Sequence, residues 1–159
     1  MKPSPISRIA VLFLLLLMWS KIYAQDSPYQ ENLRVASELF IAERELPDSV
    51  LLRLVPKNDE EFALLYGSTS PGNSLQNTGF FSAVTQQIFN RTLIDRKEIF
   101  YLPCLQLASF ADGEFGEDFT DNLEKIIALD RSKFCKSIKG KSYADRNPIK
   151  YFAVENKCE

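Results

Sequence analysis

The stretch FADGEFGEDF, residues 110–119, holds the densest group of side chains in the chain that could do chemistry. Four acids, two glycines and three phenylalanines fall within its ten positions. Carboxylates at this spacing could hold a calcium ion, or two of them could act as general acid and general base. The same residues could instead form the corner between two helices.

The calcium pattern fails at two positions. A calcium loop that begins at Asp112 needs glycine at its sixth position and glutamate at its twelfth, where the chain has Glu117 and Leu123. A corner fits better, because Gly113 follows an apolar segment and can end a helix with a positive φ. We therefore predict a structural corner at Asp112 and Gly113, in preference to an adventitious cation site or a catalytic carboxylate pair.

The chain contains no histidine, which excludes several kinds of site. Ser-His-Asp and Cys-His catalysis and imidazole zinc ligands all require that side chain. There is also no glycine-rich phosphate loop and no cofactor fingerprint. We predict no catalytic, cofactor-binding or metal-binding residue, although chemistry based on carboxylate, lysine or tyrosine stays open.

Residues 1–24 have the three-part pattern of a secretory signal peptide. Lys2 and Arg8 precede the apolar run from Ile9 to Trp19, and Ala24 supplies a small residue for cleavage. The apolar run is about half the ~20 residues that a transmembrane helix needs. We expect cleavage after Ala24 and a soluble protein, secreted or periplasmic, without stable membrane insertion.

The remaining residues, 25–159, carry 16 lysines and arginines against 21 acids, a net charge of −5. Binding to nucleic acid requires a basic stripe, and anionic membranes attract basic segments. The net charge therefore argues against both kinds of partner. A chain of this length is ordinary for one domain with its own core, so we expect residues 25–159 to form a single domain.

The pattern of apolar residues and caps predicts helices joined by short turns. Ser27-Pro28, Asn58 and Asp130 are typical helix starts, a long amphipathic helix is expected from Asn77 to about Ile94, and residues 95–98 have the spacing of a capping box. The predicted fold is all-α, with about six or seven helices. They pack either as stacked antiparallel hairpins or as an irregular bundle.

The longest loop, GSTSPGNSLQN at residues 67–77, is rich in small and polar residues and has no apolar period. Such loops carry binding residues in some proteins and are only connections in others. The candidate binding loop comprises Gly67, Ser68, Thr69, Ser70, Pro71, Gly72 and Asn73.

Residues 98–139 run as an apolar helix, an Asp-Gly corner, an amphipathic helix, an Asp turn and a short helix. This order resembles the helix–corner–helix units of HEAT-like α-helical repeat proteins, over 42 of the 159 residues. No repeat at the ~40-residue period of those proteins is found. The resemblance implies binding through a helical surface.

Export into an oxidising compartment makes one disulfide plausible among the three cysteines. Cys104 is flanked by apolar residues and suits a buried position. We favour a bond between Cys135 and Cys158, which would hold the end of the chain in place. The alternatives are Cys104–Cys158, Cys104–Cys135 and no bridge.

These features together predict an exported, non-enzymatic protein that binds another protein, as an inhibitor, an immunity factor or an adaptor. The alternative is an exported hydrolase that uses two carboxylates, for example to cleave glycans.

Overall fold

The computed structural model describes residues 27–158, and all of its regular elements are helical. The predicted signal peptide, residues 1–24, lies outside this range. The all-α prediction is confirmed, with eight α-helices in the described residues where six or seven were expected. They are α2 (Pro28–Ile41), α3 (Asp48–Leu54), α4 (Asp59–Gly67), α5 (Phe80–Leu93), α6 (Tyr101–Ala108), α7 (Gly116–Leu129), α8 (Arg131–Ile138) and α9 (Ile149–Glu155), with short 3₁₀ turns η1 (Glu98–Phe100) and η2 (Gly113–Phe115).

Three predicted helix starts are confirmed by their capping hydrogen bonds. Ser27 forms a capping box with Gln30 at the start of α2. Asn58 Oδ1 accepts a hydrogen bond from the Glu61 amide (2.9 Å), and Asp130 Oδ1 accepts one from the Lys133 amide (2.8 Å). Each cap satisfies one of the amides that a helix leaves unpaired in its first turn.

Two predicted boundaries are wrong. Helix α5 begins at Phe80 rather than Asn77, because the residue before it, Gly79, is left-handed with a φ of 71°. Residues 95–98 form no capping box, and the residue before η1 is Lys97. Its side chain instead donates to Asp48 Oδ2 on α3 (2.6 Å), a contact between residues 49 positions apart.

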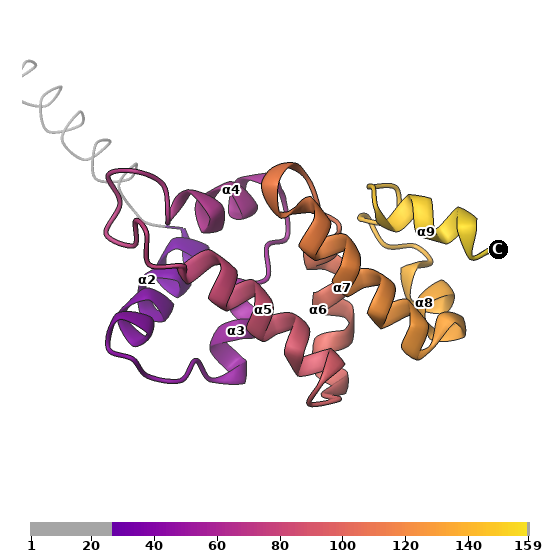
Figure 1. Ribbon diagram of the computed structural model, residues 1–159, viewed down its shortest axis with the longest axis horizontal. Coiled ribbons are helices and arrows are strands. Elements are labelled where there is room, and N and C mark those ends of the chain that lie inside the picture. Colours follow the sequence, from indigo (N-terminus) through magenta and orange to yellow (C-terminus); the bar gives the residue numbers. More distant parts are fainter. Residues whose placement is uncertain (1–26, 159) are drawn as a thin grey trace, which may run out of the picture.

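The helices lie in three groups along the longest axis of the molecule (Figure 1). Helices α5, α6 and α7 pack against one another in the centre, α2, α3 and α4 lie at one end, and α8 and α9 lie at the other. One continuous core links the three groups, from Leu51 on α3 through Phe89 and Leu105 in the centre to Phe134 on α8 and Ile149 on α9. Within residues 27–158 every helix is too short or too polar to cross a bilayer.

Candidate functional site

The FADGEFGEDF stretch has the geometry of a helix corner. Helix α6 already ends at Ala108, and Gly113 has a φ of +62° at the start of η2, so the corner is longer than a single glycine turn. The Asp112 carboxylate accepts a hydrogen bond from the adjacent Gly113 amide (2.7 Å). Within the part of the chain that the structure describes, no cluster of three or more Cys, Asp or Glu side chains could hold a metal ion.

The phenylalanines of the corner explain its place in the fold better than its acids do. Phe110 stacks on Phe62 of α4 with ring centroids 4.9 Å apart, and Phe115 and Phe119 contact the same ring at 5.3 Å and 6.4 Å. Phe81 of α5 joins this cluster through Phe115 (5.2 Å). Aromatic pairs of this kind add to the stability gained from burial. The corner therefore ties α4 to the central helices.

The loop that follows α4 is held by hydrogen bonds to its own ends. Asn73 Nδ2 donates to the Gly67 carbonyl (2.6 Å), and the Gly72 amide donates to Gln76 Oε1 (2.9 Å). The Ser68 hydroxyl donates to the carbonyl of Leu65 (2.6 Å) in the last turn of α4. These contacts span the whole predicted binding loop, so its shape is set before any partner arrives.

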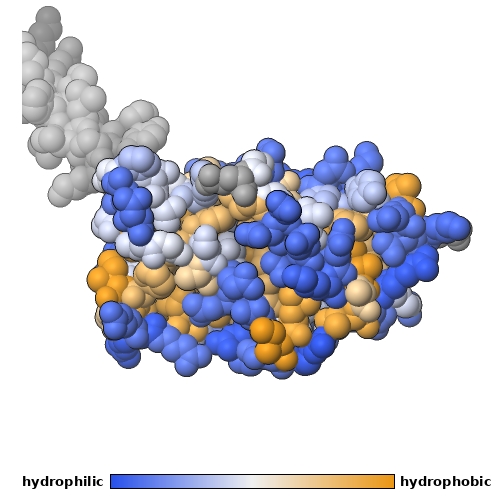
Figure 2. Space-filling model, in the orientation of Figure 1, coloured by the Kyte–Doolittle hydropathy of each residue, from blue (hydrophilic) through white to orange (hydrophobic). Residues whose placement is uncertain are grey.

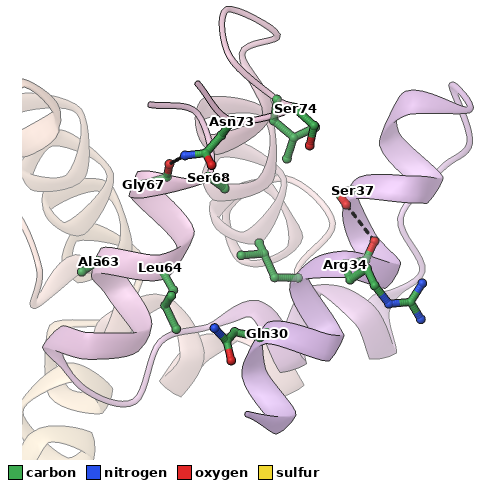
Figure 3. A pocket seen from close by; sticks show the side chains of 11 residues that line it. Gln30, Arg34, Ser37, Ala63, Leu64, Gly67, Ser68, Asn73 and Ser74 are labelled. Carbon is green, nitrogen blue, oxygen red and sulfur yellow. Dashed lines mark hydrogen bonds between the residues drawn. The ribbon is translucent and has the colours of Figure 1, made fainter. Parts of the chain in front are cut away.

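This loop closes one end of a groove of about 420 Å³ between α2 and α4 (Figure 3). The groove is lined by Gln30, Leu33, Arg34, Ser37, Ala63, Leu64, Gly67, Ser68, Asn73, Ser74 and Leu75. In Figure 3, Arg34 and Ser37 lie on the α2 wall and Leu64 on the α4 wall, while Asn73 and Ser74 approach from the loop.

Three of the seven predicted binding-loop residues line this groove: Gly67, Ser68 and Asn73. The other four, Thr69 to Gly72, do not. The sequence reasoning missed the α2 wall, because nothing in the pattern of residues 28–41 shows which helix faces the loop.

The α2 wall carries both signs of charge. Arg34 Nη2 lies 2.7 Å from Glu31 Oε1, and a second nitrogen of the same guanidinium pairs with Glu38. The hydrogen bond from Arg34 lowers the pKa of Glu31. The leucines of the groove pack against the core, so an apolar floor lies between polar walls.

A second group of charged residues connects α3 to the end of α5. Arg91 pairs with Asp48 (2.9 Å), Asp95 (2.8 Å) and Glu45 (3.1 Å), and Asp48 also accepts from Lys97. Each carboxylate in this group has a cation beside it, which favours its ionised form. The arrangement suits a link between helices rather than a proton donor.

The sulfur atoms of Cys135 and Cys158 lie 1.92 Å apart, at bonding distance, and this is the pairing favoured from the sequence. Cys104 is fully buried on α6, where its thiol donates to the Ile88 carbonyl (3.2 Å) and contacts the Thr92 hydroxyl. Burial raises the pKa of the Cys104 thiol to about 12. A buried, protonated thiol is a poor nucleophile.

The groove between α2 and α4 is thus the site that combines the predicted loop, an apolar floor and polar walls. In comparisons with known proteins, no family model, no curated protein and no solved structure matches this chain.

Proposed function

We propose that this protein is an exported, non-enzymatic binding module that takes a segment of another protein into the groove between α2 and α4. The observation that carries the proposal is the fixed loop beside an apolar floor. A partner that enters a groove of fixed shape loses less free energy to ordering than one that must fold a flexible loop.

The lining of the groove favours a protein segment as its ligand. Leu33, Leu64 and Leu75 offer a surface for an apolar side chain, and Ser37 and Asn73 lie beside it with hydrogen-bonding groups. Pockets in proteins combine apolar contact with a few polar groups in this way. The resemblance of residues 98–139 to HEAT-like units also favours binding through helices.

The hydrolase alternative has no comparable support. A catalytic acid needs a carboxyl group whose pKa is raised toward the working pH. The shifted carboxyl groups of residues 27–158 are Glu31 and Asp59, and an arginine lowers the pKa of each. We therefore propose no catalytic pair.

Export is part of the proposal. The Cys135–Cys158 pair fits an oxidising compartment, where disulfides persist. Mass spectrometry of the protein released by its host should give a chain that begins at Gln25. A chain that retains residues 1–24 would contradict the predicted cleavage.

The groove can be tested by filling it. In Ser37→Trp, an indole replaces a small side chain on the α2 wall, and Ser49→Trp, on the exposed start of α3 and outside the groove, is the matched control. Residues 25–159 are immobilised and used to capture proteins from the exported fraction of the host. We expect one dominant partner with the wild type and the control and its loss with Ser37→Trp.

Two results would contradict the proposal. One is equal capture by Ser37→Trp and the wild type, which would place the contact elsewhere. The other is the absence of any partner together with cleavage of a glycan by the wild type, which would support the hydrolase. Circular dichroism and thermal melting show whether each variant is folded.

A further inference from the structure

The net charge of this protein hides a strong separation of charge. Residues 27–130 contain eight lysines and arginines against 17 acids, a net charge of −9. Residues 131–158 contain eight lysines and arginines against two acids, a net charge of +6. The second segment comprises α8, the connection after it, and α9, and we call it the basic end.

The basic end lies together at one extremity of the molecule (Figure 1). Its arginines and one lysine are engaged: Arg146 pairs with Asp59 (2.6 Å), Lys133 pairs with Glu98, and Arg131 donates to the Asn156 carbonyl. The remaining five lysines form no ion pair with any residue between 27 and 158. They are Lys136, Lys139, Lys141, Lys150 and Lys157, and all five are exposed.

Three of these lysines surround a hollow of about 390 Å³ between α8 and α9. Its lining is Cys135, Ile138, Lys139, Gly140, Lys141, Ala144, Asp145, Lys150, Ala153, Val154 and Cys158. Ile138, Ala153 and Val154 give it apolar surface, and Val154 is 74% exposed. Figure 2 shows hydrophilic and hydrophobic side chains interspersed over this end of the molecule.

We propose that this hollow is a second docking site, for an acidic protein segment that carries an apolar side chain among its carboxylates. Lys139, Lys141 and Lys150 would pair with the carboxylates, and the apolar side chain would lie against Val154. Unpaired lysines around a small apolar surface match that chemistry on both counts.

The lining separates this ligand from other anions. A membrane surface or a nucleic acid presents phosphates and needs a uniformly basic contact. This hollow places the carboxylate of Asp145 beside its lysines and ends in an apolar floor. Both features disfavour a polyphosphate and are compatible with a peptide.

The site is distinct from the groove between α2 and α4, which lies at the opposite end of the molecule (Figure 1). The two sites share no residue. A protein with both would connect two partners, and each site can fail its test without affecting the other.

The test uses residues 25–159 and a fluorescent peptide of repeated Glu-Leu-Asp, with fluorescence anisotropy as the readout. The variant K139Q/K141Q/K150Q removes three positive charges from the hollow. The control variant R53Q/K57Q/K125Q removes three exposed positive charges from the acidic part of the chain. A peptide with glutamine and asparagine in place of the acids, and one with alanine in place of leucine, complete the set.

We expect the acidic peptide to bind the wild type and the control variant equally, and the hollow variant about tenfold more weakly, as three partly exposed ion pairs would give. Replacement of either the acids or the leucines should also weaken binding, and added salt should reduce it. Equal binding by the hollow and control variants would overturn the proposal.

Two further measurements distinguish other occupants. Tighter binding to phosphatidylglycerol vesicles or to an oligonucleotide than to the peptide, lost in the hollow variant, would replace the proposed ligand with a phosphate polyanion. Light scattering after gel filtration reports self-association. A dimer of the wild type that the hollow variant lacks would make the acidic face of a second copy the occupant, and a monomer supports an external partner.

Discussion

Removal of the disulfide should destabilise the domain by an amount that follows from its place in the chain. Cys135 and Cys158 are 23 residues apart, and closing a loop of that length lowers the entropy of the unfolded chain by about 3.4 kcal/mol at 25 °C. Both side chains are half-buried, so replacement by serine should lose little packing. For a domain of this size, the melting temperature should fall by about 12 °C.

The assay compares the wild type, C135S/C158S and both proteins with a reductant, by thermal melting and urea unfolding. Reductant should lower the stability of the wild type to that of the double variant and leave the double variant unchanged. A thiol reagent should titrate one thiol in the unfolded, unreduced wild type, from Cys104, and almost none in the folded protein. Three thiols, or equal stability of the two proteins without reductant, would refute the reasoning.

Three further predictions concern the corner and one exposed ion pair. Gly113→Val should lower the free energy of unfolding by about 1–2 kcal/mol because of its positive φ, whereas Gly116→Ala, at an ordinary helical φ with only a 3.8 Å contact, should be neutral or slightly stabilising by urea unfolding. Calcium titration by calorimetry should show no binding that Asp112→Asn removes; micromolar affinity would contradict the corner. Arg146 lowers the pKa of Asp59, so this pair should stabilise the fold above about pH 4 and lose its effect as acid protonates Asp59. The difference in melting temperature between the wild type and Arg146→Gln should therefore shrink at low pH, and a constant difference would show that the pair does not contribute.

The all-α class and three helix starts were predictable because their signals are local. A cap such as Ser27, Asn58 or Asp130 acts on amides within three residues of itself, so its effect can be read from the sequence alone. The boundary at residues 95–98 could not be predicted in the same way. Lys97 binds Asp48 on a distant helix, and a contact over 49 residues overrides the local pattern.

The groove was predictable only in part for the same reason. The composition of residues 67–73 marks a loop, but Arg34 and Ser37 belong to the site because α2 packs beside α4. The charge of the basic end differs, since a count by segment is enough to find it. The net charge of the whole chain concealed it. That both α8 and α9 face the same hollow requires the structure.

The bond between Cys135 and Cys158 also has a consequence for survival among proteases. Lys139 and Lys141 are exposed on the connection between α8 and α9, where a trypsin-like enzyme could cut the chain. Such a cut falls inside the loop that the disulfide closes, so α9 would remain covalently attached to α8. Phe152 and Ile149 would still fill their places in the core. The cut protein should migrate as one chain until it is reduced, and the hollow between the two helices should survive the cut.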